Sequence, residues 1–128
     1  MPVRVAIADH HALVREGIAL LVQRDAGLSV VGQAGDADGI PAMLARSGCD
    51  VLLLDLYMDG NTAVDIASLA RQVKVIVLTE SEQPSDAAAA IRAGARGFIS
   101  KRYAADTMIQ AIHAVACGGT WLTPDLRT

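Results

Sequence analysis

The stretch Val51-Leu52-Leu53-Leu54-Asp55-Leu56 decides the fold, because four consecutive apolar residues are followed directly by a carboxylate. Apolar residues at every position are typical of a strand that is covered on both faces, as the central strands of parallel sheets are. The run is far shorter than the roughly 20 apolar residues that a membrane span needs. It therefore predicts a central parallel strand over residues 51–54 with Asp55 at its carboxyl end.

Strand and helix patterns alternate on both sides of this stretch. Further strands are predicted at residues 3–8, 28–34, 75–78 and 97–99, and helices at 11–24, 38–47, 62–71, 84–93 and 104–117. The first helix has an expected core-facing stripe of Leu13, Val14, Gly17, Ile18 and Leu21. Five strand–helix units with short connections predict right-handed crossovers in one parallel sheet. We expect a flavodoxin-like (βα)5 three-layer sandwich with the five strands in the order 2-1-3-4-5.

Length and composition limit the function classes. The 128 residues suit one domain, which we expect at residues 1–119, with residues 120–128 beginning a linker. A net charge of −3 without a basic stripe argues against nucleic-acid binding by this segment. Cys49 and Cys117 lack the spacing of a metal site and are expected to be reduced thiols. With no signal peptide or membrane span in the sequence, a cytoplasmic protein is expected.

The predicted strands end in residues that can do chemistry. Asp9 follows the first strand, Asp55 the third and Thr79 the fourth, and Lys101 lies just after the fifth. Ligands of open α/β sheets bind beyond the carboxyl ends of the strands, so these side chains are expected to meet. Separately, each has a simpler explanation as a helix cap, a turn residue, a strand-end hydroxyl or a solvated charge. Together they favour a phospho-acceptor pocket.

That set of groups suits phosphoryl transfer, which depends on positioning and electrostatics. Crowded carboxylates hold a hard cation such as Mg²⁺, so Asp9 and Asp55 are the expected metal ligands. The cation would keep Asp55 ionised and nucleophilic. Thr79 could donate to one phosphoryl oxygen while Lys101 pairs with another.

Longer motifs around these residues resemble the receiver domains of NarL/FixJ (LuxR-type) response regulators. They are Asp9-His10-His11-Ala12-Leu13-Val14-Arg15-Glu16-Gly17, residues 51–56, Val77-Leu78-Thr79 and Ala93-Gly94-Ala95-Arg96-Gly97-Phe98-Ile99-Ser100-Lys101. The resemblance implies phosphorylation of Asp55 by a sensor histidine kinase, with Mg²⁺ also bound by the backbone carbonyl of Tyr57. It further implies a switch that couples Thr79 to Phe98. The tail would lead to a helix-turn-helix DNA-binding domain that this chain lacks.

Three positions depart from that family pattern. His10 stands where a second acid is usual, and a neutral imidazole is a poor ligand for Mg²⁺, so weakened metal binding is expected. Alternatively, Asp9 and Asp55 suffice, with water completing the shell. Glu80 replaces a small residue; it repels a phosphoryl donor if it points inward and is an ordinary surface charge if it points outward. Asp59, in an altered loop, either restores negative charge to the pocket or is a solvated turn residue.

The histidines allow one further interpretation. His10, His11 and His113 are not expected to form a zinc site, because adjacent histidines should point in different directions and a third ligand with suitable spacing is missing. A protonated His10 beside Asp9 and Asp55 could instead supply charge in place of the metal.

Two functions follow from these observations. The first is a phosphorylation-driven switch that alters dimerisation and so controls an attached DNA-binding domain. The expected dimer surface is formed by the helices at 11–24 and 104–117, or by the helix at 84–93, the strand at 97–99 and the helix at 104–117. The second is an atypical receiver that dimerises or docks partners without phosphorylation. An enzyme is not expected, beyond catalysis of the chain's own phosphorylation and dephosphorylation, and neither is a membrane partner.

Overall fold

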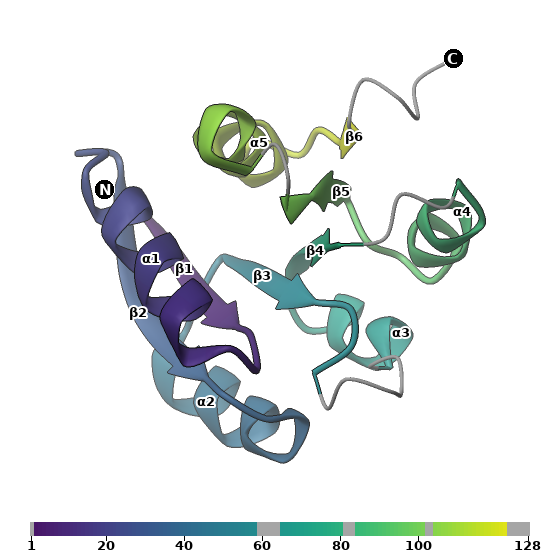
Figure 1. The fold of residues 1–128 in the computed structure, drawn as a ribbon, viewed down its shortest axis with the longest axis horizontal. Coiled ribbons are helices and arrows are strands. Elements are labelled where there is room, and N and C mark those ends of the chain that lie inside the picture. The colour runs from purple at the N-terminus through teal and green to yellow at the C-terminus, as the bar shows by residue number, and fades with distance from the viewer. Residues whose placement is uncertain (1, 59–64, 81–83, 102–103, 123–128) are drawn as a thin grey trace.

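The computed structural model describes residues 2–58, 65–80, 84–101 and 104–122 of the chain (Figure 1). Its centre is one parallel sheet of β1 (Val3–Ala8), β2 (Leu28–Ala34), β3 (Val51–Asp55), β4 (Lys74–Thr79), β5 (Gly97–Ser100) and β6 (Trp121–Leu122). The strands lie in the order β2-β1-β3-β4-β5-β6. The predicted order of the first five strands is therefore confirmed, and the chain belongs to the flavodoxin-like class.

The sixth strand was not expected from the sequence. Trp121 and Leu122 pair in parallel with Gly97 and Phe98 of β5, and the backbone N–H of Trp121 donates to the carbonyl of Arg96 at 2.9 Å. A strand of two residues is too short to produce a periodic pattern, so residues 120–128 resembled a linker. The pairing covers the edge of β5 along part of its length.

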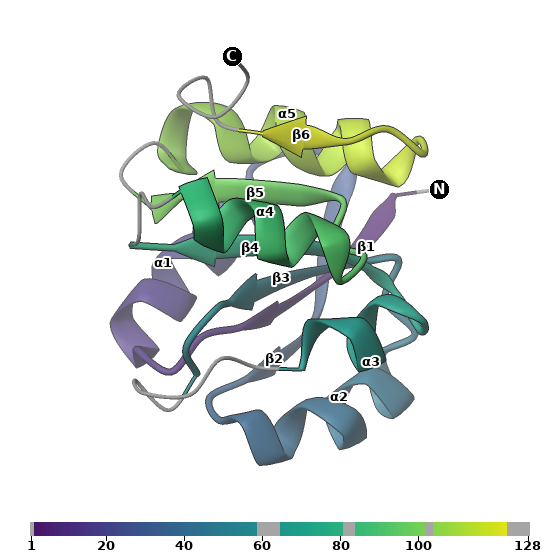
Figure 2. The ribbon, with the colours of Figure 1, turned by 90° about the vertical axis from the view of Figure 1, so that its right-hand side faces the viewer.

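Helices cover both faces of the sheet and complete the three layers (Figures 1 and 2). The helices are α1 (Ala12–Gln23), α2 (Ile40–Ser47), α3 (Ile66–Ala70), α4 (Pro84–Arg92) and α5 (Ala104–Ala116), with a short 3₁₀ turn, η1, at Ala37–Gly39. One core cluster joins α1 and α5 to the sheet, and a second joins α2, α3 and α4 to its other face. No helix within the described ranges is long and apolar enough to cross a membrane.

The orientation of α1 differs from the sequence prediction. Leu13 and Val14 were expected in the core, but their exposed fractions are 84% and 37%. The buried residues of α1 are Ile18, Ala19 and Val22. Arg15 shares the helix face of Ile18, Ala19 and Val22 by its spacing, and its guanidinium donates to the backbone carbonyl of Asp9 at 2.7 Å. The face that contacts the sheet therefore includes Arg15 and leaves Leu13 outward.

Local contacts define the C-terminal end of α4 and the N-terminal end of α3. Gly94 has φ +112 directly after α4, as glycine at a helix C-terminus often does, and a Cβ at this position would lie 2.9 Å from the Cβ of Ala70. The expected start of the third helix, Thr62, lies outside the described residues. In the described part, α3 begins at Ile66, and the Asp65 side chain accepts from the backbone N–H of Ser68.

Both cysteines are free thiols, Cys117 exposed and Cys49 partly buried. Burial raises the pKa of the Cys49 thiol. A raised pKa and partial burial both lower the reactivity of the Cys49 thiol.

Candidate functional site

Four strand ends meet at one edge of the sheet and form a polar pocket. Asp9 follows β1, Asp55 ends β3, Thr79 ends β4 and Lys101 follows β5. Asp9 is 1% exposed and Asp55 is 5% exposed, although most carboxylates lie at protein surfaces. Two buried carboxylates on neighbouring strands need positive partners, since an unpaired buried charge is costly.

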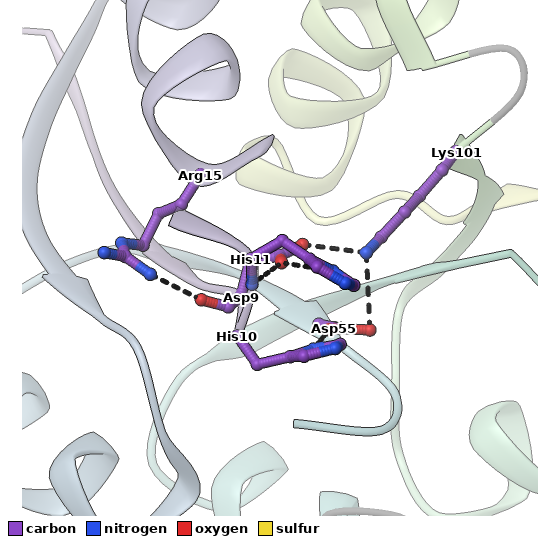
Figure 3. Close-up of polar contacts among 6 residues, drawn as sticks. All are labelled: Asp9, His10, His11, Arg15, Asp55 and Lys101. Atoms are coloured by element: carbon purple, nitrogen blue, oxygen red, sulfur yellow. Dashed lines mark hydrogen bonds and ion pairs between the residues drawn. The ribbon is translucent and has the colours of Figure 1, made fainter. Parts of the chain in front are cut away.

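Lys101 supplies one such partner and is shared between the two acids. Its Nζ lies 2.8 Å from Oδ2 of Asp9 and 3.5 Å from Oδ1 of Asp55 (Figure 3). The Lys101 side chain is only 13% exposed, so its charge acts in a partly desolvated setting. The structure thus brings Asp9, Asp55 and Lys101 into direct contact.

His10 contacts the opposite side of the Asp55 carboxylate. Its Nδ1 lies 2.5 Å from Oδ2 of Asp55, and the two groups form a hydrogen bond. The His10 side chain is 28% exposed, which leaves the imidazole at the mouth of the pocket. One oxygen of Asp55 is therefore engaged by His10 and the other faces Lys101.

His11 is also part of this pocket, which the sequence analysis did not anticipate. The expectation that adjacent histidines point in different directions is wrong: the ring centroids of His10 and His11 lie 3.8 Å apart. A turn produces this arrangement, because the backbone N–H of His11 donates to Oδ1 of Asp9 at 2.8 Å. In contrast, His113 lies on α5, where its Nε2 is 3.3 Å from Oδ2 of Asp25.

Thr79 lies at the pocket edge of the sheet, whereas Phe98 and Tyr57 belong to or pack against the core below α4. Leu78 pairs with Asp55 in the β3–β4 register, so Thr79 lies one residue further along β4, and it is 2% exposed. Phe98 is 1% exposed and belongs to the core cluster under α4. Tyr57 is half-buried just beyond β3 and packs against the same cluster.

Of the two remaining atypical positions, Glu80 and Asp59, the structure describes only Glu80. Glu80 is exposed, which agrees with the alternative of an outward-facing surface charge. Asp59 lies outside the described residues. Arg15, which the sequence analysis did not single out, positions the pocket through its contact with the Asp9 carbonyl.

Asp9, His10, His11 and Asp55 could hold a metal ion, since one ligand atom from each lies within 4.8 Å of the others. The donor set suits Mg²⁺ poorly, because Mg²⁺ takes oxygen ligands and two of these four residues offer nitrogen. The hydrogen bond from His10 also engages one oxygen of Asp55. The four residues could therefore hold a metal ion, but their donors are not the all-oxygen set that Mg²⁺ prefers.

Comparisons with known proteins agree with this architecture. UhpA, a transcriptional regulatory protein of Salmonella typhimurium, is 38% identical over 125 residues, which are 97% of this chain and 64% of UhpA. A two-component response regulator of the LuxR family from Aurantimonas sp. superposes with a TM-score of 0.90 at 26% identity, over 98% of this chain and 93% of that one.

The isolated receiver of RcsB from Salmonella enterica serovar Typhimurium, solved with phosphomimetic BeF₃⁻, superposes with a TM-score of 0.87 at 25% identity, over 98% of this chain and 96% of that one. RcsB has also been solved as two dimers bound to two parallel DNAs. The chain spans just under two thirds of UhpA. Residues 5–113 match the response regulator receiver domain family, so the pocket, the sheet order and the sequence agree: this chain belongs to that family, in its NarL/LuxR-type branch.

Proposed function

We propose that this chain is the phosphorylation-controlled receiver of a transcriptional response regulator, with Asp55 as the acceptor. The observation that carries the proposal is the buried Asp55 carboxylate, which faces the Lys101 ammonium at 3.5 Å. A nucleophile with a nearby fixed positive charge is what phosphoryl transfer requires, since the transferred group is itself an anion. The related RcsB receiver was solved in the presence of a phosphomimetic, which supports the same assignment.

The transfer forms one bond and breaks another. An oxygen of Asp55 bonds to the phosphorus while the bond from phosphorus to a histidine nitrogen of the sensor kinase breaks, and the electron pair remains on that nitrogen. Lys101 pairs with one phosphoryl oxygen, and the Thr79 hydroxyl donates to another. Because Lys101 also pairs with Asp9, the incoming phosphoryl group competes with Asp9 for the ammonium.

His10 makes this acceptor unusual. Its hydrogen bond to Oδ2 must weaken before that oxygen can attack phosphorus. When bound, Mg²⁺ would offset phosphoryl charge, and its oxygen donors here would be Asp9, Asp55 and the Tyr57 carbonyl. Since His10 replaces an acid, we expect weaker Mg²⁺ binding than in a pocket with three carboxylates.

The output follows from the position of Phe98. Movement of Thr79 toward the phosphoryl group opens space that Phe98 can fill, which alters the surface of α4, β5 and α5. That surface, or the one formed by α1 and α5, would control a homodimer, and DNA would be bound by a further domain of the whole protein. The DNA-bound dimers of RcsB support this output, and a sensor histidine kinase in the same cytoplasmic compartment would be the donor.

Intact-mass measurement after incubation with acetyl phosphate and millimolar Mg²⁺ tests the proposal. We expect a gain of one phosphoryl group in the wild type and no gain in Asp55→Asn. Asp38→Asn is the control variant, because Asp38 is an exposed acid on η1 away from the pocket. Equal labelling of the wild type and Asp55→Asn would contradict the assignment.

The His10 contact also favours a second candidate, a receiver that signals without phosphorylation. If His10 and Lys101 hold Asp55 permanently, the pocket is a fixed structural element and the domain acts by dimerisation or docking. The same measurement separates the two functions. Absence of labelling at millimolar Mg²⁺, in a protein that is folded by circular dichroism, would favour this second function.

A further inference from the structure

We propose that Asp9, His10, His11 and Asp55 form a binding site for a borderline transition-metal ion, of which Zn²⁺ is the best fit. This site uses both imidazoles at the end of β1, so it differs from the all-oxygen site considered for Mg²⁺ above. Binding to it does not depend on the phosphorylation proposed for Asp55, although binding would affect that reaction.

The four residues lie close enough to share one ion. Ligand atoms from all four residues lie within 4.8 Å of one another. The two imidazoles extend from the end of β1 toward the side of the pocket that holds Asp55 (Figure 3). Bond lengths of about 2.0–2.1 Å place neighbouring ligand atoms of a tetrahedral Zn²⁺ site roughly 3.3 Å apart, so modest side-chain rotation would close the site.

The two imidazoles lie at the open side of the pocket and the two carboxylates at its base. The carboxylates are almost fully buried, with side-chain exposures of 1% for Asp9 and 6% for Asp55. The imidazoles are more open, at 28% for His10 and 52% for His11. Two fixed oxygen donors at the base and two adjustable nitrogen donors at the mouth allow an ion to enter from solvent.

The charges of the buried carboxylates and of Lys101 do not cancel. Lys101 gives one positive charge to two buried carboxylates. The guanidinium of Arg15 is turned to the backbone carbonyl of Asp9 rather than to its side chain. Two carboxylates and one ammonium leave one negative charge, and a divalent ion placed between the imidazoles and the carboxylates would more than offset it.

The chemistry of the donors selects the class of metal. Imidazole nitrogen suits Zn²⁺, Cu²⁺ and Ni²⁺, whereas Mg²⁺ and Ca²⁺ prefer oxygen. Two nitrogens with two carboxylate oxygens match the tetrahedral coordination of Zn²⁺. Replacement of an acid by His10, together with the inward turn of His11, therefore shifts the pocket from hard cations toward borderline ones.

Occupancy would oppose phosphorylation. Four protein ligands would fill a tetrahedral Zn²⁺ site and leave no open position for a phosphoryl oxygen, whereas Mg²⁺ keeps waters that a phosphoryl oxygen can replace. Zn²⁺ would therefore act as an inhibitor of the acceptor and would favour the unphosphorylated state.

Titration of the untagged, metal-free protein with Zn²⁺ and with Co²⁺ tests the site. We expect one Zn²⁺ per chain by calorimetry, and with Co²⁺ the visible absorption bands of a tetrahedral site that Zn²⁺ abolishes. Loss of even an outer-sphere partner costs metal affinity about 10–100-fold, so His10→Ala and His11→Ala should each weaken binding at least about tenfold. His113→Ala, which removes a histidine outside the pocket, should leave the affinity unchanged.

The metal titration and the phosphorylation test can fail independently of each other. Affinity for Zn²⁺ that is unchanged in both His10→Ala and His11→Ala, or no stronger than for Mg²⁺, would overturn the proposed site whether or not Asp55 is labelled. If Asp55 is labelled, prior addition of Zn²⁺ should suppress labelling in the wild type and much less in His11→Ala. Equal suppression in both would contradict the inhibitory role.

Discussion

The two sides of the pocket around Asp55 differ in chemistry although they share one sheet edge. On the β4–β5 side, Thr79 and Lys101 offer a hydroxyl and an ammonium, the groups that bind phosphoryl oxygens. On the β1 side, His10 and His11 offer imidazoles where oxygen donors for a hard cation would be expected. Asp55 contacts both sides, through His10 at one oxygen and Lys101 at the other.

This difference leads us to expect that the two roles of the pocket can change independently. The groups that would bind the phosphoryl oxygens come from β4 and β5, whereas those that would bind a cation come mainly from the turn after β1. We therefore expect substitution at position 10 to alter the cation preference without moving Thr79 or Lys101. Measurements that separate the two sides test the account most sharply.

The largest effect is expected for Lys101→Met. Loss of this ammonium leaves the carboxylates of Asp9 and Asp55 buried without their shared partner. Removal of one member of a buried ion pair typically costs about 3–5 kcal/mol, and we expect roughly 3 kcal/mol here because Lys101 retains some exposure. Urea unfolding measures the free energy directly. A loss below about 1 kcal/mol would mean that Lys101 does not stabilise the pocket.

The next effect concerns Thr79. Loss of a hydrogen bond to a charged group costs about 1.5–3 kcal/mol, so Thr79→Ala should slow phosphoryl uptake by an order of magnitude or more. The rate of labelling by acetyl phosphate measures this effect. Thr79→Ser retains the hydroxyl and is the matched control. Similar rates for the two variants would show that the hydroxyl is not used.

A smaller effect is expected on the β1 side from His10→Asp. An acid at position 10, in addition to Asp9 and Asp55, should strengthen Mg²⁺ binding by about 1.4 kcal/mol. This change lowers the Mg²⁺ concentration for half-maximal labelling about tenfold. Gln110→Asp adds the same charge at an exposed position of α5 and should leave the Mg²⁺ dependence unchanged. If both variants respond equally, net charge rather than position 10 controls the cation.

The smallest effect is expected at the opposite end of the sheet. The backbone N–H of Arg4 donates to Asp50 at 2.9 Å and its guanidinium lies 3.2 Å away, which holds the pKa of Asp50 below its ordinary value of 3.8. A lowered pKa stabilises the fold above the ordinary value, and this contribution is lost as the pH falls through the folded value. Because the pair is exposed, Asp50→Asn should cost less than about 1 kcal/mol at pH 7.

Urea unfolding at several pH values checks this difference, which should shrink as Asp50 is protonated in strong acid. A difference between Asp50→Asn and the wild type that grows on acidification would contradict the sign. The pair also serves as a reference for Lys101→Met, because it shows what an exposed ion pair contributes in the same protein.

Sequence reasoning reached the sheet order, because buried parallel strands have continuous apolar runs and short connections restrict the topology. It also placed Asp9, Asp55 and Lys101 at one edge, since parallel strands end on the same side. It could not find the direction of His11, which depends on a turn closed by the Asp9 side chain. The exposure of Leu13 was missed because the buried face of α1 includes a charged residue, Arg15, whose guanidinium contacts a backbone carbonyl, and an apolar pattern does not reveal such a position.

The central claim is that Asp55 is the phospho-acceptor of a pocket shared between His10 and Lys101. The most direct measurement treats the protein with acetyl phosphate, reduces the acyl phosphate with borohydride and identifies the converted residue by peptide mass spectrometry. The account predicts conversion at Asp55, and less of it in Lys101→Met. Conversion at another carboxylate while Asp55 remains unmodified would contradict the account.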